Sequence, residues 1–241
     1  MRSAGRRRAD VLVIALDTPF DPVDAVDGTF ATDNFRAGEL IGMWARAGMG
    51  VSAATAKIVT LDGSGTQVTV EVLRNQGFLK GFGIDIRDPG RMYDEDDPRI
   101  VGSAATMGTA EGARSAMERL MRADPGISVV YAINEPAAAG AYDALRELGV
   151  EDEVLIVTID GGCEGVRSVA AGEIAATALQ YPLRMASLGV EAVVEFLATG
   201  RRPKNTPGLD FHDTGVTPVT ERPVAGIPSV GADWGLSECW G

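Results

Sequence analysis

The chain has 241 residues, of which 45% are hydrophobic and 23% charged, a composition typical of globular proteins that form one large domain or two small ones. Its formal net charge of −12 argues against nucleic acid as a partner, because contacts with phosphates require a basic surface. The single histidine, His212, argues against histidine-based acid–base catalysis and against a metal site built from histidines.

The first residues combine a basic stretch with a short apolar one, in the sequence MRSAGRRRADVLVIALDTP. The apolar run at residues 11–16 is too short to span a membrane. It is also too short for the core of a signal peptide, and Asp17 ends it without a small-residue cleavage site. We therefore predict a buried strand over residues 11–16 that ends at Asp17.

Strand and helix patterns alternate along the chain after this strand. Asp33 or Asn34 is expected to cap the first helix. The glycine-rich segment 63–66 follows a strand, but it lacks the lysine and the spacing of a phosphate-binding loop, so we predict a turn there. The predicted strands are 29–34, 56–63, 129–134, 154–160 and 174–180, and the predicted helices are 35–48, 70–82, 110–124, 181–200 and one that starts at Pro136.

Two stretches are predicted to be irregular. The acidic run at residues 94–97 lies in a polar segment and is predicted to be a solvated loop, with a calcium site as the weaker alternative. The final forty residues contain five prolines and are predicted to form extended or looping segments rather than helices.

Three of the predicted strands end in polar side chains. The apolar runs VVYAIN, VLIVTID and IAATALQ end at Asn134, Asp160 and Gln180. Apolar runs separated by helices are typical of a parallel sheet covered on both faces, and ligands of such sheets bind beyond the carboxyl ends of the strands. Carboxylates accept hydrogen bonds and amides both accept and donate them, so this trio suits the hydroxyls of a small polar molecule. The simpler alternative for Asn134 and Asp160 is that each only caps the following helix.

Several segments also carry a resemblance to a known family. They are VLVIALDTP, TFATDNFRAGELIG, KIVTLDGSGT, VEVLRNQGFLKGF, VVYAINEPAAAGAYDAL, VTIDGGCEGV and GEIAATALQYPLRMASLGVEAVVEFLATG. In this order they resemble the type I periplasmic sugar-binding proteins of ABC importers, the ribose/galactose/fructose group. The C-terminal segment is most similar to the fructose-binding branch.

The resemblance implies an α/β fold with two doubly wound parallel-sheet lobes, of which the first is incomplete. Residues 1–35 and 182–200 would belong to the first lobe, and residues 36–181 and 201–241 to the second. In the family the strand at 11–16 comes late in the first lobe. We therefore expect that the signal peptide and most of the first lobe are absent, and that this chain alone binds sugar poorly.

The resemblance also implies the ligand-binding residues, which are Asp17, Arg74, Asn134, Asp160 and Gln180. Arg74 fits the family's RxxGF pattern, although a solvated arginine would be the default for this helix. Thr18 stands where ribose binders have an arginine, and Gly108 where they place a stacking aromatic. These differences argue against ribose as the ligand.

The function implied is that of the substrate-binding component of an importer. Such a protein binds a monosaccharide, with fructose as the leading candidate, between two lobes in the periplasm and delivers it to a membrane permease. No catalysis, metal or cofactor is implied, and paired-carboxylate hydrolysis by Asp17 and Asp160 is a much weaker hypothesis. The main alternative is the effector-binding core of a sugar-responsive transcriptional repressor.

The chain has two cysteines, Cys163 and Cys239. An even pair in a protein that resembles exported proteins favours a disulfide between them. Two unrelated buried thiols are the alternative, because the spacing of two cysteines in sequence does not show their proximity.

Overall fold

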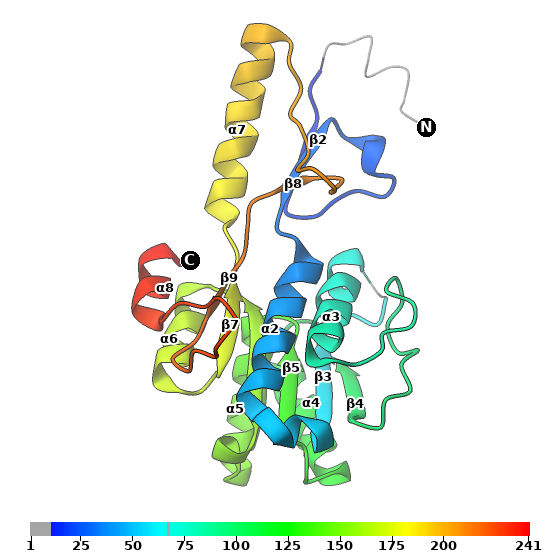
Figure 1. Cartoon of the computed structure of the whole chain (residues 1–241), viewed down its shortest axis with the longest axis vertical. Helices are drawn as coiled ribbons and strands as arrows, with labels where there is room; N and C mark the ends of the chain where they lie inside the picture. Colours follow the sequence, from blue (N-terminus) through cyan, green and yellow to red (C-terminus); the bar gives the residue numbers. More distant parts are fainter. Residues whose placement is uncertain (1–10, 67) are drawn as a thin grey trace. The chain divides into compact units, whose positions relative to one another are not determined.

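The computed structural model describes residues 11–66 and 68–241, which divide into two compact units (Figure 1). Unit 1 contains the described residues up to Asp33 together with Gln180–Gly215, and unit 2 contains Asn34–Leu179 and Val216–Gly241. Residues 201–215, which we expected in the second lobe, therefore lie in unit 1. The reason is that the strand His212–Asp213 pairs with a strand of unit 1.

Unit 1 is a small parallel sheet covered by one long helix. Strands β1 (Ile14–Leu16), β2 (Gly28–Ala31) and β8 (His212–Asp213) pair in the order β1-β2-β8, with the 3₁₀ helix η1 (Val23–Ala25) between the first two. Helix α7 (Pro182–Thr199) contacts both β1 and β2. Strand β1 is shorter than the strand that we predicted over residues 11–16. Val13 lies just before it and contacts Asp27, with its N–H donating to the Asp27 carboxylate at 2.9 Å and its carbonyl oxygen accepting from the Asp27 N–H at 2.7 Å.

Unit 2 contains the larger sheet, with strand order β4-β3-β5-β6-β7-β9. The first five are parallel and β9 is antiparallel to β7. Apolar strands joined by helices produce this arrangement because a parallel pair requires a crossover connection. The strands are β3 (Ile58–Asp62), β4 (Ile100–Ala105), β5 (Val129–Ala132), β6 (Leu155–Asp160), β7 (Ala176–Leu179) and β9 (Thr217–Val219).

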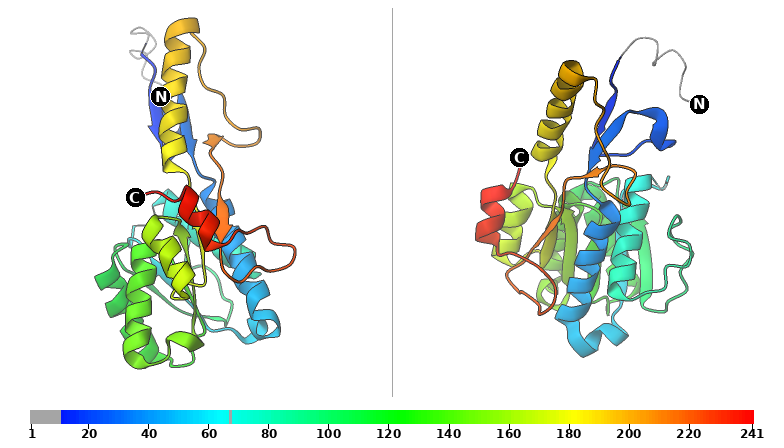
Figure 2. Two further views of the ribbon diagram at one scale, coloured as in Figure 1. Left: turned by 90° about the vertical axis from the view of Figure 1, so that its left-hand side faces the viewer. Right: turned by 45° about the horizontal axis from the view of Figure 1, so that its top comes forward.

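Helices cover both faces of this sheet. Helices α2 and α3 pack against each other on one face, and α4 and α5 pack against each other on the opposite face (Figures 1 and 2). The helices of unit 2 are α2 (Asn34–Met49), η2 (Gly50–Thr55), α3 (Thr69–Phe82), α4 (Ala110–Ala123), α5 (Glu135–Leu148), η3 (Glu151–Glu153), α6 (Cys163–Ala171) and α8 (Ala232–Glu238). No helix in the described part of the chain has both the length and the hydropathy that crossing a membrane requires.

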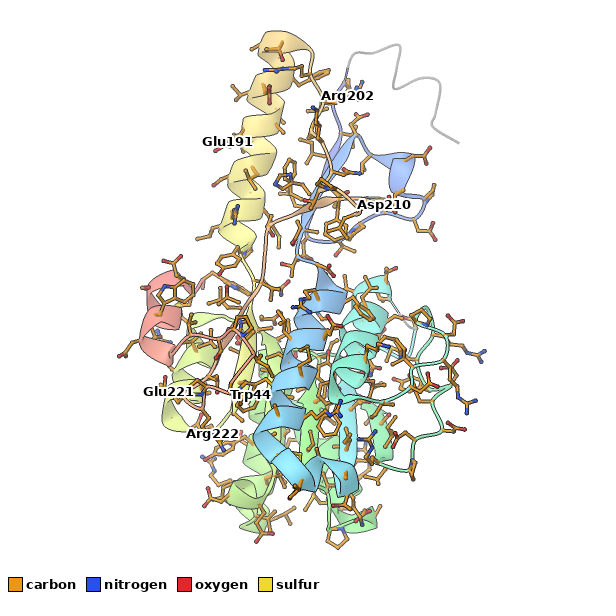
Figure 3. All side chains as sticks on the ribbon, in the orientation of Figure 1. Trp44, Glu191, Arg202, Asp210, Glu221 and Arg222 are labelled. Atoms are coloured by element: carbon orange, nitrogen blue, oxygen red, sulfur yellow. A yellow bond between two sulfur atoms is a disulfide. The ribbon has the colours of Figure 1, made fainter. Side chains whose placement is uncertain are left out.

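The core of unit 2 lies between the sheet and helices α2 and α3. Phe78 of α3 stacks on Tyr131 of β5 with their ring centroids 4.6 Å apart, and both side chains are fully buried. Trp44 of α2 is also buried and uses its indole Nε1 to donate to the backbone oxygen of Arg222 at 3.0 Å (Figure 3). This bond gives the buried indole N–H of Trp44 a partner, and it attaches the segment after β9 to α2.

Glycines allow α2 and α3 to approach until their backbones touch. A Cβ atom added at Gly38 or Gly42 of α2 would collide with the backbone of α3. A Cβ atom at Gly77 or Gly81 of α3 would collide in the same way with the backbone of α2. The two helices are therefore in contact along two reciprocal pairs of glycines, and this contact fixes the position of α3 relative to α2.

The prediction that the last forty residues lack helices is wrong. Residues Ala232–Glu238 form α8, which packs beside α6 (Figure 1). The last proline of the chain is Pro228, so nothing in the backbone of α8 prevents a helix. Gly235 makes the contact with α6 close, since a Cβ there would lie 3.0 Å from the Val166 side chain.

Candidate functional site

The carboxyl ends of β5 and β6 bring the predicted residues Asn134 and Asp160 to one edge of the unit 2 sheet. Asp160 is the last residue of β6, and Asn134 lies two residues beyond the end of β5. Both line a cleft of about 790 Å³ between α5, α6 and the C-terminal residues. The sheet therefore places one carboxylate and one amide at the same opening, as the pattern of strand ends predicts.

Arg74 reaches this edge from α3. Its Nη1 donates to the Asp160 carboxylate at 3.1 Å and to the backbone oxygen of Ile133 at 3.0 Å. Its Nε donates to the side-chain oxygen of Asn34, the first residue of α2, at 2.8 Å. Only 9% of the Arg74 side chain and 18% of the Asp160 side chain are exposed, so the ion pair is screened little by solvent.

Asn34 is a site residue that sequence reasoning missed, since we predicted it only as a possible helix cap. It is 2% exposed, and it holds the guanidinium of Arg74 through the bond described above. The sequence contained no signal for this pairing, because the two residues are 40 positions apart. The close contact between α2 and α3 brings them together.

Asn134 both caps α5 and faces the cleft. Its side-chain oxygen accepts from the backbone N–H of Ala137 at 3.0 Å, as in a helix N-cap, and its side-chain nitrogen donates to the Gly108 carbonyl at 3.0 Å. An amide has two acceptor and two donor positions, so each of its polar atoms keeps one position for a ligand. The capping role and the binding role that we considered for Asn134 are therefore compatible.

Glu135, next to Asn134, supports the turn that follows Asp160. Its Oε1 accepts from the Gly161 N–H and from the Thr177 hydroxyl, both at 2.8 Å, and its Oε2 accepts from the Gly162 N–H at 2.9 Å. Burial and the nearby charge of Asp160 raise the pKa of Glu135 to about 7, although these hydrogen bonds oppose the shift. Sequence reasoning did not identify Glu135.

Asp62, the last residue of β3, is a further carboxylate at a strand end. It is fully buried, and it accepts hydrogen bonds from Thr60, Asn75 and Tyr93 at 2.6, 2.9 and 3.1 Å. Burial raises the pKa of Asp62 to about 6 despite these bonds. Because protein donors already surround both oxygens, Asp62 connects α3 to the loop after it rather than presenting itself to a ligand.

The remaining two predicted ligands, Asp17 and Gln180, belong to unit 1. Asp17 follows β1, is exposed and has a positive φ of 72°. Gln180 directly follows β7 and is 5% exposed. Their binding roles remain predictions.

Cys163 and Cys239 form a disulfide with their Cα atoms 5.0 Å apart. This is one of the two arrangements that we considered for the cysteines. The bridge ties the start of α6 to the residue that follows α8. It therefore holds the C-terminal residues Trp240 and Gly241 at the cleft that Asn134 and Asp160 line.

Residues 7–202 match the family described as a periplasmic binding protein domain. The chain therefore belongs to the periplasmic binding protein family, which confirms the resemblance drawn from its segments.

Two relatives illustrate the similarity. The ribose import binding protein RbsB of Escherichia coli (strain K12) is 30% identical over 193 residues, which cover 79% of this chain and 58% of that protein. The galactofuranose-binding protein YtfQ of the same organism is 26% identical over 204 residues, which cover 81% and 59%. The chain thus spans a little over half the length of these relatives, which are named as binding proteins and not as enzymes.

Solved structures agree on the fold. A galactofuranose binding protein superposes with a TM-score of 0.74 at 22% identity, covering 97% of this chain and 72% of that one. The fructose binding periplasmic domain of a hybrid two component system gives a TM-score of 0.70 at 23% identity, covering 90% and 66%. At these identities the likeness concerns the fold alone, and it confirms the expected α/β fold of the type I periplasmic binding proteins.

Proposed function

We propose that this protein is the substrate-binding component of a sugar ABC importer, which binds a neutral monosaccharide and delivers it to a membrane permease. The observation that carries the proposal is the ion pair of Arg74 and Asp160, set beside Asn134 where two parallel strands end. The proposal includes no catalytic step. It places the protein in the periplasm, a compartment in which a disulfide such as Cys163–Cys239 persists.

The chemistry of the three side chains suits sugar hydroxyls. The Asp160 carboxylate can accept from two hydroxyls, and Arg74 and Asn134 can donate to hydroxyl or ring oxygens. The bonds to Asn34, Ile133 and Asp160 use Nε and Nη1 of Arg74. The two N–H groups of Nη2, which pair with none of the described residues, can therefore bind adjacent sugar oxygens. Asp17 and Gln180 are proposed as further ligands.

Fructose is the leading candidate for the sugar. Thr18 and Gly108 differ from the arginine and the stacking aromatic that we expect of a ribose binder, and the C-terminal segment is most similar to the fructose-binding branch. The relatives named for ribose and for galactofuranose make these two sugars the necessary comparisons.

Calorimetric titration of the full-length gene product tests the proposal. We expect binding of fructose, and weaker or no binding of ribose and galactofuranose. Binding of amino acids or nucleotides in place of every sugar would show that the proposal is wrong.

The variant Asp160→Ala should lose about 2–4 kcal/mol of binding free energy, because hydrogen bonds to a charged group are lost. Asp143→Ala is the matched control, since Asp143 forms an exposed ion pair on α5 and should leave the affinity unchanged. An Asp160→Ala variant that binds as tightly as the control would remove Asp160 from the site.

A further inference from the structure

Asp160 has a backbone conformation that L residues rarely adopt. Its φ is 138°, and the next residue, Gly161, has a φ of 75°. Glycine tolerates positive φ without cost, but an aspartate adopts it only where its surroundings hold it there. We call residues 160–163 the Asp160 turn. The backbone conformation of Asp160 sets the direction in which its own side chain leaves the chain. The Asp160 turn therefore determines where the carboxylate points.

Glu135 holds the Asp160 turn from the side of α5. Its carboxylate accepts the N–H groups of Gly161 and Gly162 at 2.8 and 2.9 Å, and also the Thr177 hydroxyl at 2.8 Å. All three partners donate to the two oxygens of Glu135, so a side chain with an acceptor at both positions fits them. An amide of the same shape would direct N–H groups at a donor.

Trp240 holds the same turn from the side of the C-terminus. Its indole Nε1 donates to the backbone oxygen of Asp160 at 3.2 Å, and its own backbone oxygen accepts from the Cys163 N–H at 3.0 Å. The disulfide joins Cys163 to Cys239, the neighbour of Trp240. The C-terminal residues are therefore attached to the Asp160 turn by one covalent bond and two hydrogen bonds.

We propose that Glu135 and Trp240 are positioning residues that together keep Asp160 in its ligand-binding conformation. The inference rests on the proposed function, because it concerns the same carboxylate. Neither residue needs to touch the sugar. Without one of them, the Asp160 turn would populate relaxed conformations, and the apparent affinity would fall in proportion to the fraction of molecules that remain competent to bind.

Two substitutions remove the two contacts selectively. Trp240→Phe removes the indole N–H and keeps an aromatic ring, and Trp234→Phe is its matched control because Trp234 lies in α8 and is 41% exposed. Glu135→Gln keeps the shape of the side chain and removes one acceptor. Circular dichroism establishes whether each variant is folded. If Glu135→Gln does not fold, Trp240→Phe still tests the proposal.

Two measurements on the full-length gene product are combined. Calorimetry with the sugar panel gives the affinity, and NMR-detected exchange of the Gly161 and Gly162 amides without sugar reports on the Asp160 turn. We expect Trp240→Phe to weaken binding about threefold to tenfold, which corresponds to the loss of one neutral hydrogen bond. Glu135→Gln should weaken it at least as much, and both should accelerate amide exchange while Trp234→Phe changes neither quantity.

The failure of this inference differs from the failure of the proposed function. If the unmodified protein binds sugar and both variants bind it equally tightly, Glu135 and Trp240 do not position Asp160. If the unmodified protein binds none of the sugars, the proposed function fails, and amide exchange alone decides the inference. Faster amide exchange in both variants would then support the inference that Glu135 and Trp240 hold the Asp160 turn, and unchanged exchange would overturn that inference.

Discussion

The reciprocal glycine contacts between α2 and α3 predict that one substitution has opposite effects at two positions of the same helix. Gly38 faces the backbone of α3, where an added Cβ would collide with the Arg74 carbonyl oxygen and lie 2.7 Å from the Phe78 nitrogen. Gly48, near the end of α2, has no atom within 4 Å of an added Cβ and is exposed. Alanine at either position gains about 0.5–1 kcal/mol of helix propensity over glycine.

At Gly38 this gain is outweighed by overpacking. Forcing an extra methyl group into a closely packed contact costs about 1–3 kcal/mol, and the obstructing atoms here are backbone atoms, which cannot rotate away. We therefore expect Gly38→Ala to lower the free energy of unfolding by about 1–2 kcal/mol, and Gly48→Ala to raise it by about 0.5–1 kcal/mol.

Urea denaturation of the 241-residue chain, followed by circular dichroism, measures both values. We expect Gly48→Ala to be the most stable, the unmodified chain to be intermediate and Gly38→Ala to be the least stable. If Gly38→Ala proves as stable as Gly48→Ala, the two helices are not in backbone contact, and the account of how Arg74 is positioned fails with it.

Three further predictions concern single groups. Asn34→Ala should lower the free energy of unfolding by about 1–3 kcal/mol, because the buried Nε of Arg74 loses its acceptor, and urea denaturation would contradict this if no loss appeared. The pKa of Glu135 is raised from 4.5 to about 7 in the folded chain, so its neutral form stabilises the fold below pH 4.5, and this stabilisation is lost as the pH rises through 7. The free energy of unfolding of the unmodified chain, measured relative to that of Glu135→Gln, should therefore fall between pH 4.5 and 7. A difference that stays constant over this range would refute the shift. Chain oxidised during production should show no free thiol after denaturation, and replacing both cysteines by serine should cost about 4 kcal/mol; two titratable thiols would exclude the bridge.

The positions of the strand ends could be predicted from sequence because the signal is local. Apolar runs that stop at a polar residue identify β5 and β6, and the parallel topology then brings Asn134 and Asp160 to one edge. The family resemblance added Arg74, whose helix has no clear apolar face. The sequence signal for each of these residues therefore lies in the segment that contains it.

Other features escaped prediction because they depend on contacts between distant segments. Asn34 meets Arg74 and Glu135 meets Gly161 only after the helices and strands are assembled. Strand β8 contains two residues, too few for any periodic pattern, so its pairing with β2 and the assignment of residues 201–215 could not be predicted. Helix α8 was missed because the prolines that precede it led us to expect no helix anywhere in the C-terminal segment.

The chain passes between the two units three times, and this has a consequence for biosynthesis. Strand β2 pairs with β8 through Phe30 and His212, so the sheet of unit 1 cannot be completed until all the elements from α2 to α7, which lie between these strands, have been synthesised. In unit 2, β3 to β7 follow one another without interruption, and only the edge strand β9 and helix α8 come after β8. We expect native structure to appear first in unit 2 during translation, because closing the long loop of unit 1 is the slower and entropically more costly event. Strands β1 and β2 would then remain without β8 while the elements from α2 to α7 are synthesised, exposing edges to which chaperones, or other nascent chains, can bind.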